Sequence, residues 1–454
     1  MYSLHRTSPP LIEPFTLVGA FPTIVSNTSR GCAKGEKEKR RILSRVLLLP
    51  ILLSLSGTGA LGQNTIIDEF RNSGTSSRGN FYGCDNATAI TCMYGAGGLT
   101  IKSADTDMSF YTQFDNNGCQ DVTGWEAQYV HVTYPGSSDF TIALQQNNLG
   151  CEQNEAPYPE TWDVVYAADY ASGGNIYIPI SHFNIIKTRA VGLAFKAFRD
   201  PNTATTFSLV EITPTLPDGM TVPSKQATGP LLFSCTRPNS IAFGIDDGQP
   251  EFAAEVMKII DDEGIKVTFF VVSNELETAD GVLKGVYKNA TANGHQIALH
   301  SYSHPKIESL AKITQMDFQI GRGYKTTKYI LGVDSKYFRP PYGTDGALTR
   351  QRLEVLYPGT RIINWSIDIE DWLYGETDGG NIKKQTDAVK RDLAKGGNLF
   401  VAHFLYRSTV DQFRGFIQLA KATGKQIMRV DQCMEDPAAP PLPTARRSVH
   451  GKRD

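Results

Sequence analysis

The chain has 454 residues, of which 41% are hydrophobic and 20% charged, and 45 Lys and Arg against 47 Asp and Glu leave a net charge of −2. At about 100–200 residues per domain, this length suggests two or three domains. The apolar fraction excludes a wholly disordered chain, and the absence of a basic excess argues against a nucleic-acid partner.

Residues 1–62 have the features of a secretory signal peptide with a long leader. A basic region at 34–45 precedes the apolar run Val46–Leu55 (VLLLPILLSL), and the small residues Ala60 and Gly62 precede Gln63. The run is too short for a helix of about 20 residues that spans a bilayer. We therefore expect cleavage, no stable membrane insertion, and secretion to the medium or the cell wall. A buried core helix and an uncleaved anchor are the alternatives.

The cysteine count fits an oxidising compartment. Loss of Cys32 from the seven cysteines would leave six, an even number that suits three disulfides. Six cysteines allow 15 pairings; proximity favours Cys84–Cys92 and Cys119–Cys151, which leaves Cys235 and Cys433 to bracket the second half. Asn86 and Asn289 are candidate acceptor sites for N-linked glycosylation, and Asn364 also matches the motif but lies in an apolar strand pattern.

Residues 63–213 predict an all-β domain. Short β-branched or aromatic segments, such as Tyr129–Tyr134 (YVHVTY) and Asn175–Ile180 (NIYIPI), are separated by Gly, Asn, Asp and Ser clusters. This spacing predicts an antiparallel sandwich or jelly roll. The patterns IYIPISHFN and AVGLAFKAF resemble galactose-binding-like jelly rolls, which are found beside carbohydrate enzymes. Sugar binding is therefore a hypothesis for this domain, with core packing as the alternative for its aromatic residues. Residues 214–234, rich in proline, predict a linker.

Residues 235–433 alternate strand and helix patterns. Apolar segments such as Ile241–Ile245 and Lys266–Val272 (KVTFFVV) alternate with amphipathic segments such as Phe252–Asp262 and Val282–Ala292. This alternation predicts an α/β fold with a parallel sheet, open or closed into a barrel, whose chemistry lies at the carboxyl ends of the strands. The further expected segments are Ile297–Leu299, Lys312–Leu331, Arg361–Ile367, Lys383–Leu393, Asn398–Ala402 and Thr409–Thr423. We expect residues 434–454 to be a disordered tail.

Polar clusters follow two of these strands. Asp246 and Asp247 end the strand Ile241–Ile245, where adjacent carboxylates splay apart, so that one can bind a metal while the other stays free as a base. His300 and His304 follow the segment Ile297–Leu299 and share a face if the chain makes a helical turn. Neutral imidazole suits zinc or a neighbouring transition metal. The alternatives are an ordinary Asp-Asp-Gly turn and structural histidines.

Three further clusters stand at expected strand ends. Arg339 opens an Arg-Pro-Pro-Tyr-Gly loop that contains Tyr342 and supplies a permanent cation beside a rigid turn. Asp368, Asp371 and Trp372 place two carboxylates beside a tryptophan. His403 follows an apolar strand. Each cluster taken singly has a structural alternative, namely a salt bridge at a strand end or a core histidine.

In this order the five clusters resemble the polysaccharide deacetylases, the NodB-homology carbohydrate esterases of family 4, over about residues 235–433. The connecting text NGHQIALHSYSH is also similar to that family. The resemblance implies a distorted (β/α) barrel, and secreted fungal chitin deacetylases look most similar. It also implies a divalent metal ion, zinc in the first place and cobalt as the alternative.

The resemblance assigns roles to single residues. Asp246 matches the general base, and Asp247, His300 and His304 match the metal ligands. Arg339 matches the residue that orients the base, and His403 the general acid, with Asp368 tuning its protonation. The backbone N–H of Tyr342 would hold the oxyanion, and Trp372 would form the wall for the acetyl methyl group.

The sequence departs from the family pattern at two motifs. Gly244 and Ile245 stand where the first motif usually has Thr and Phe; Val401 and Phe404 replace residues of the last motif. We expect these changes to affect substrate range more than the reaction. The leading hypothesis is a secreted N-deacetylase acting on chitin or a related N-acetylated polysaccharide. The alternatives are an acetylxylan-type O-acetyl esterase and a non-catalytic wall- or chitin-binding protein with a decayed barrel.

Overall fold

The computed structural model describes residues 63–442 apart from 72–73, 81, 86, 116–117, 149, 153–160 and 377–379. The expected signal peptide, the acceptor Asn86 and the basic end of the tail at 443–454 lie outside the described residues. Contacts assign residues from Gly62 onward to a single unit. No helix among the described residues is long and apolar enough to cross a membrane.

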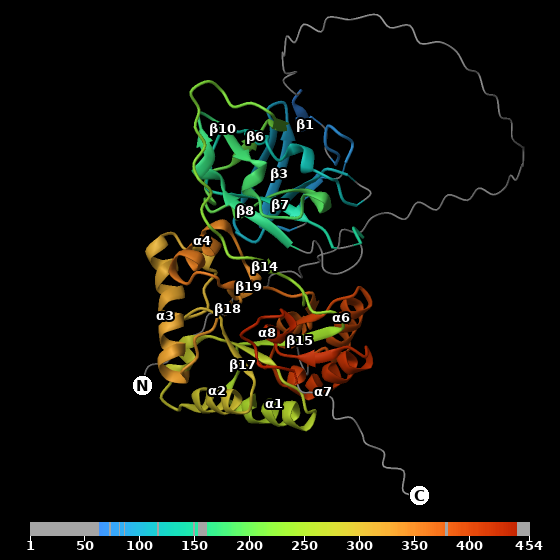
Figure 1. Cartoon of the computed structure of the whole chain (residues 1–454), viewed down its shortest axis with the longest axis vertical. Helices are drawn as coiled ribbons and strands as arrows, with labels where there is room; N and C mark the ends of the chain where they lie inside the picture. The colour runs from blue at the N-terminus through green and yellow to red at the C-terminus, as the bar shows by residue number, and fades with distance from the viewer. Residues whose placement is uncertain are drawn as a thin grey trace, which may run out of the picture. The chain divides into compact units, whose positions relative to one another are not determined.

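Residues 65–213, which we call the β domain, form two antiparallel sheets of five strands each (Figure 1). Strands in the first sheet alternate: Val130 and Val132 face the core, while the ring of His131 on the other face stacks on that of Tyr177 at 4.2 Å. The second sheet supplies Phe110 and Phe195 to the same core. The predicted all-β character is confirmed; the jelly-roll connectivity stays a prediction. The first sheet has the strand order β1 (Thr65–Asp68), β13 (Leu209–Thr213), β6 (Tyr129–Thr133), β10 (Asn175–Pro179) and β9 (Ala171–Ser172). The second has the order β2 (Tyr82–Cys84), β5 (Ser109–Gln113), β11 (Ala190–Lys196), β7 (Thr141–Gln146) and β8 (Thr161–Tyr166). A smaller third sheet consists of β12 (Thr205–Phe207), β4 (Gly98–Ser103) and β3 (Ile90–Gly95).

The aromatic side chains of the β domain serve packing. Trp125 lies edge-on to Phe114 at 5.3 Å, and Trp162 lies edge-on to Phe233 at 5.2 Å. Among its described residues, the large hydrophobic side chains that are exposed are aliphatic: Ile66, Met93 and Ile186. The described part of the β domain therefore presents no prominently exposed aromatic platform for stacking on sugar rings.

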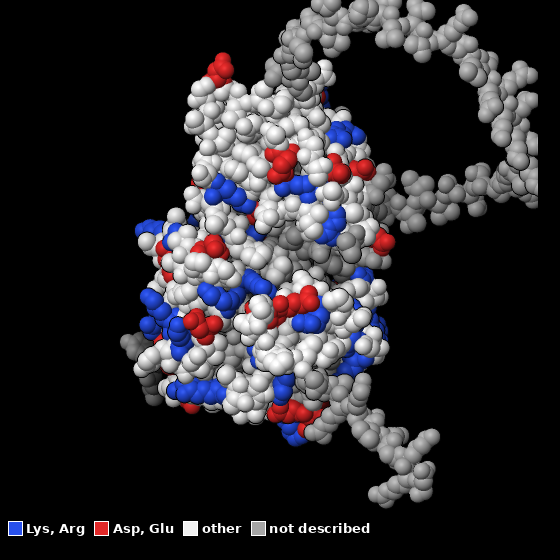
Figure 2. All heavy atoms as spheres, viewed as in Figure 1, with Lys and Arg blue, Asp and Glu red and all other residues white. Residues whose placement is uncertain are grey.

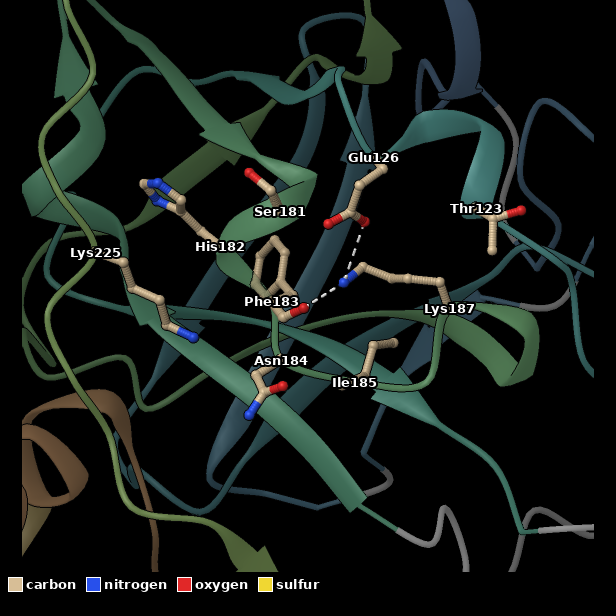
Figure 3. Close-up of a pocket in the computed structure, with 9 residues that line it drawn as sticks. All are labelled: Thr123, Glu126, Ser181, His182, Phe183, Asn184, Ile185, Lys187 and Lys225. Atoms are coloured by element: carbon tan, nitrogen blue, oxygen red, sulfur yellow. Dashed lines mark hydrogen bonds and ion pairs between the residues drawn. The ribbon is translucent and has the colours of Figure 1, made fainter. Parts of the chain in front are cut away.

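A hollow of about 620 Å³ in the β domain is lined by Thr123, Glu126, Ser181, His182, Phe183, Asn184, Ile185, Lys187 and Lys225 (Figure 3). Its two lysines are occupied within the protein. Lys187 pairs with Glu126 at 3.4 Å and donates to the carbonyl of Phe183, and Lys225 pairs with Asp163. None of the polar clusters expected from the sequence lines this hollow, so it is separate from the candidate site.

The second half forms a curled parallel sheet, and the predicted α/β fold is confirmed. The strands run in the order β14 (Leu231–Leu232), β19 (Arg361–Ile363), β18 (Tyr337–Phe338), β17 (Gln296–Leu299), β16 (Thr268–Val271), β15 (Ser240–Asp246), β21 (Leu399–His403) and β20 (Ile367–Asp368), and β22 (Gln426–Met428) also pairs with β15. The expected strand Arg361–Ile367 is in fact two strands: β19 is second in this order, and β20 is last. The curled sheet is therefore an incomplete barrel.

Helices lie around the outside of this sheet (Figure 1). In α1 (Pro250–Asp262), Ala253, Val256, Met257 and Ile260 recur at helical spacing and are buried against the sheet. The other helices are α2 (Val282–Ala292), α3 (Ile313–Leu331), α4 (Ala347–Leu356), α5 (Asp371–Tyr374), α6 (Ile382–Ala394), α7 (Arg407–Ala422) and α8 (Val430–Cys433). The periodicity of the sequence predicted α1, α2, α3, α6 and α7 to within two residues at each end, and missed α4, α5 and α8.

Charges of both signs are mixed on the surface in view in Figure 2, with Lys and Arg interspersed among Asp and Glu. Several pair between α1 and α7, such as Arg414 with Asp262 and Lys421 with Glu263. On that face the described residues present no broad field of one sign, the feature that steers a polyanion.

Residues 434–442 correct the expectation of a tail that is disordered from 434. Met434 is buried, the hydroxyl of Tyr337 donates to Asp436 at 2.8 Å, and the amide of Gln432 donates to the carbonyl of Pro440. The fold continues through these residues because they cover the core beside α8.

The structure confirms the three expected disulfides, Cys84–Cys92, Cys119–Cys151 and Cys235–Cys433. The third joins residues 198 apart in the chain and closes the α/β region between the segment before β15 and α8. Both of its sulfurs belong to buried residues.

Removing the Cys235–Cys433 bridge should cost more stability than removing Cys84–Cys92, because the closed loop is far longer. For Cys235→Ala/Cys433→Ala we expect a loss of about 2–5 kcal/mol, by loop-closure entropy in the unfolded chain. Denaturant unfolding of both double variants under oxidising conditions measures the difference. Equal losses would contradict the loop-length argument.

Candidate active site

Two adjacent carboxylates at the end of β15 point to different partners. Asp246 is the last residue of the buried strand, and Asp247 takes a left-handed backbone conformation with φ 53°. This turn directs Asp246 toward Arg339 and Asp247 toward the two histidines that follow β17. The backbone therefore directs the two carboxylates to different partners, and their separate roles stay a prediction.

Asp247, His300 and His304 converge. The Nε2 atom of His300 lies 3.7 Å from Oδ1 of Asp247, and the Nε2 atom of His304 lies 3.5 Å from its Oδ2. One ligand atom from each of the three residues can be chosen so that all lie within 4.8 Å of one another. Because the histidines follow β17 and the carboxylate follows β15, the curl of the parallel sheet brings them together.

The donor set fits a divalent transition metal. Nδ1 of His300 donates to the carbonyl of Arg339 at 2.7 Å, which leaves Nε2 free as a ligand, the arrangement seen for metal-binding histidines. Burial and the charge of the neighbouring His300 lower the pKa of His304 to about 4, so its imidazole is neutral at pH 7. Oδ1 of Asp247 is buried without a hydrogen-bond partner in the described structure. A cation would satisfy that oxygen.

Arg339 is fully buried and holds Asp246. Its Nη1 donates to Oδ1 of Asp246 at 2.6 Å, and its other nitrogens donate to the carbonyls of Ile363, Asn364 and Phe400, each at 3.2 Å. Gly244 is what makes room for it, because a Cβ at that position would lie 2.5 Å from the guanidinium. The departure from the family pattern at Gly244 thus has a packing reason.

His403 lies beside the carboxylates, since it pairs in register with Asp246 across β15 and β21. Its Nδ1 donates to Oδ1 of Asp371 at 2.8 Å, and its backbone N–H donates to Oδ2 of the same carboxylate. Burial alone would lower the pKa of His403, but the charge and hydrogen bond of Asp371 outweigh burial, and Asp246 and Asp247 add to them. Together they raise the pKa to about 10.

This contact favours Asp371 over Asp368 as the hydrogen-bond partner of His403, and the tuning role expected for Asp368 stays a prediction. Oδ1 of Asp368 accepts from the backbone N–H of Glu370 at 2.7 Å, and burial raises the pKa of Asp368 to about 7. The carboxylate in contact with His403 is that of Asp371. Glu370 between them has φ 57°, and this left-handed residue turns Asp371 back toward the histidine. Sequence spacing alone could not choose between the two aspartates.

Tyr342 and Trp372 are the aromatic residues at the rim. Tyr342 is 59% exposed, its φ is 61°, and its ring lies 4.6 Å from that of His304. Trp372 is 37% exposed and follows Asp371 in α5. Elsewhere, Asn289 is exposed on α2, which keeps glycosylation there a prediction.

Sequence reasoning noted Phe404 only as a departure from the family pattern and missed Lys306 and Glu308, although all three contribute contacts at the site. Phe404 is buried, and its ring occupies the place that a Cβ of Gly248 would take, 2.0 Å away. Lys306 and Glu308 lie just beyond His304 and anchor its loop, and their contacts are described below. An isolated Lys or Glu in a loop gives no sequence signal of such contacts; only the position next to His304 could have drawn attention to them.

We predict that Asp247→Asn weakens zinc binding by about 100-fold or more, because a neutral amide oxygen replaces a charged ligand. Mutating a metal ligand should lower the affinity more than mutating a residue that only hydrogen-bonds to a ligand. Isothermal titration of the full chain with zinc measures the affinity. Asp317→Asn, which removes a carboxylate of α3 that pairs with Arg352, is the control and should bind zinc as the unaltered chain does. Equal affinities for both variants would refute the site.

The second half of the chain, which holds these residues, is similar in sequence to known proteins. A family model described as polysaccharide deacetylase matches residues 233–356. A chitin deacetylase from Pestalotiopsis sp is 30% identical over 219 residues, which cover 48% of this chain and 70% of that protein. A chitin deacetylase from Colletotrichum lindemuthianum is 26% identical, over 46% of this chain and 84% of that protein.

Solved structures show likeness over the same share of the chain. The chitin deacetylase structure from Colletotrichum lindemuthianum is 22% identical with a TM-score of 0.40, and the match covers 48% of this chain and all of that one, at 100%. On the strength of the sequence relationship to the Pestalotiopsis protein, the chain belongs to the polysaccharide deacetylase family.

Proposed function

We propose that the protein is a secreted, metal-dependent hydrolase that removes N-acetyl groups from chitin or a related polysaccharide of N-acetylglucosamine. The observation that carries this is the meeting of Asp247, His300 and His304 beside a second carboxylate, Asp246, with the imidazole of His403 on the neighbouring strand. Such an arrangement has a cation site, a base and an acid around one point, which amide hydrolysis requires.

The metal ligands would be Asp247, His300 and His304, with zinc the first choice and cobalt the alternative. A divalent cation there would lower the pKa of a water toward about 7 and polarise the acetyl carbonyl. Asp246 would accept a proton from the attacking water. Its Oδ1 is held by Arg339, so Oδ2 is the atom available for that proton.

His403 would protonate the amine nitrogen as it leaves the acetyl group. Because its Nδ1 is bonded to Asp371, Nε2 carries the proton that is donated. The N–H of Tyr342 would donate to the oxygen that becomes negative in the transition state. Trp372, partly exposed next to Asp371, would form the wall that receives the acetyl methyl group.

The substrate class is supported by the relatives. Two of them are named chitin deacetylases, and another, from Arthroderma benhamiae, is named a probable peptidoglycan-N-acetylglucosamine deacetylase. These names share N-acetylglucosamine polymers as substrates. The three disulfides support an oxidising compartment, and so secretion.

Acetate release tests the function directly. With zinc supplied, we expect release from N-acetylglucosamine oligomers and its loss on chelation. Asp246→Asn should lower kcat by about 100-fold or more, since the base is removed, while zinc affinity is retained. Cleavage of acetylated xylan alone would favour the esterase. No release from either substrate, with polymer binding unchanged in Asp246→Asn, would favour a wall-binding protein.

The pH dependence of kcat tests the pairing of His403 with Asp371. His403 is active as an acid when protonated, so activity is present below its pKa and lost as the pH rises through it. Asp371→Asn removes the charge that raises this pKa, so burial dominates. The alkaline limb of the profile should therefore move to lower pH by more than one unit, measured from pH 6 to 10 at saturating metal.

Asp368→Asn is the matched control, because it removes the neighbouring carboxylate that does not contact His403. We expect it to shift the alkaline limb less than Asp371→Asn does. A larger shift in Asp368→Asn would assign the tuning role to Asp368.

A further inference from the structure

One short loop of the β domain lies against the loop that follows His304, and Lys196 and Trp162 of the β domain contact Asp345 beyond Tyr342, each at 3.1 Å. The short 104–108 loop, between β4 and β5, carries Asp105 and Asp107. The ammonium of Lys306, two residues after His304, donates to both Asp105 oxygens at 2.8 Å and lies 2.8 Å from Oδ2 of Asp107. Thr106 and Ser309 share a hydrogen bond of 2.6 Å beside them. The loop that carries His304 is thus bound to the β domain.

Lys306 also contacts Tyr342, in the loop that follows Arg339. Its ammonium lies 5.7 Å from the centre of the Tyr342 ring, within the range of a cation–π contact. That ring is 4.6 Å from the ring of His304. Burial would lower the pKa of Lys306, but Asp107 and Asp105 raise it above its usual value, so the ammonium stays charged.

Glu308 and Arg199 provide further contacts to the loop after His304. Glu308 has 0% exposure and accepts from the N–H and the hydroxyl of Thr349, at 2.8 and 2.7 Å, at the start of α4. From the β domain, Arg199 donates to the carbonyl of Glu308 at 2.9 Å and to that of Leu310. The loop after His304 is therefore held both by the start of α4, which follows the Arg339 loop, and by the β domain.

Tyr342 is one of the residues of these loops with a left-handed backbone, and it is the exposed one. A non-glycine residue at φ 61° has a strained backbone, which persists where its surroundings over-determine it. Asn364 holds the next residue, since its amide donates to the carbonyl of Gly343 at 3.1 Å. The side chain of Tyr342 itself is held at the rim by His304 and Lys306.

We propose that the β domain is a working part of the deacetylase site: Asp105 and Asp107 hold Lys306 against Tyr342 and thereby position the Tyr342 turn. These three charged residues are positioning residues, because they act through Tyr342. The expected effect of these contacts on catalysis rests on the proposed function. Their expected effect on the Tyr342 turn rests on the contacts alone. It gives the β domain a role that requires no sugar-stacking surface.

The test compares four variants in the full chain. Lys306→Met keeps most of the side-chain length and removes the charge; Lys306→Arg keeps the charge; Asp105→Asn/Asp107→Asn removes the partners. Lys328→Met is the matched control, because Lys328 forms an exposed ion pair with Asp334 at 2.7 Å at the end of α3. The first readout is hydrogen exchange at the amides of residues 342–346, with zinc affinity and melting temperature measured alongside.

Exchange at 342–346 should rise at least fivefold in Lys306→Met and in the double variant, recover in Lys306→Arg, and stay unchanged in Lys328→Met. Zinc affinity should stay within twofold, because no metal ligand is altered. In deacetylation, kcat should fall about 10-fold with little change in KM, a fraction of the roughly 10²–10³-fold effect of losing an oxyanion donor.

Unchanged exchange at 342–346 in Lys306→Met and in the double variant would overturn the proposal, and so would a lower melting temperature with unchanged exchange, since the contact would then serve stability alone. If the unaltered protein releases no acetate from any substrate, the proposed function fails. The exchange result still decides whether the β domain holds the turn.

Discussion

The buried ion pair between Arg339 and Asp246 is the constraint on which the rest of the site depends. A guanidinium and a carboxylate withdrawn from water cost several kcal/mol each unless attraction and hydrogen bonds offset the loss. Here three backbone carbonyls at 3.2 Å complete the guanidinium, and its centre lies 4.1 Å from the ring of Phe270. The carbonyl of Arg339 also fixes the His300 ring. One residue thus orients both Asp246, the proposed base, and His300, a proposed metal ligand.

The order of the strand ends along the chain could be predicted from the sequence, and it predicted which residues of the candidate site would meet. Asp247, His300 and His403 stand at the ends of different strands, yet parallel strands end at the same edge of a sheet, so their meeting follows from the alternation of strand and helix. Two of the disulfide pairs followed from proximity. The incomplete barrel did not follow, because the segment 361–367 reads as one apolar strand and folds as two.

The directions of the side chains could not be predicted, because they depend on backbone conformations that sequence patterns do not reveal. Of the ten described non-glycine residues with positive φ, five lie at the candidate site: Asp247, Ser301, His304, Tyr342 and Glu370. Strain of this kind collects at functional sites, where the surrounding structure holds it. It explains why two adjacent aspartates diverge after β15, and why Asp371 contacts His403 while Asp368, at the end of β20, bonds the backbone instead.

The strained residues differ in what holds them. Asp247 follows directly on a buried strand, so the sheet core supports its conformation. Tyr342 stands on an exposed turn beyond β18, where the sheet has ended and support must come from neighbouring loops. Lys306 supplies part of it, and the carboxylates that fix Lys306 belong to the β domain. The segment between β13 and β14 therefore separates two folds along the chain, while the rim of the candidate site draws residues from both sides of it.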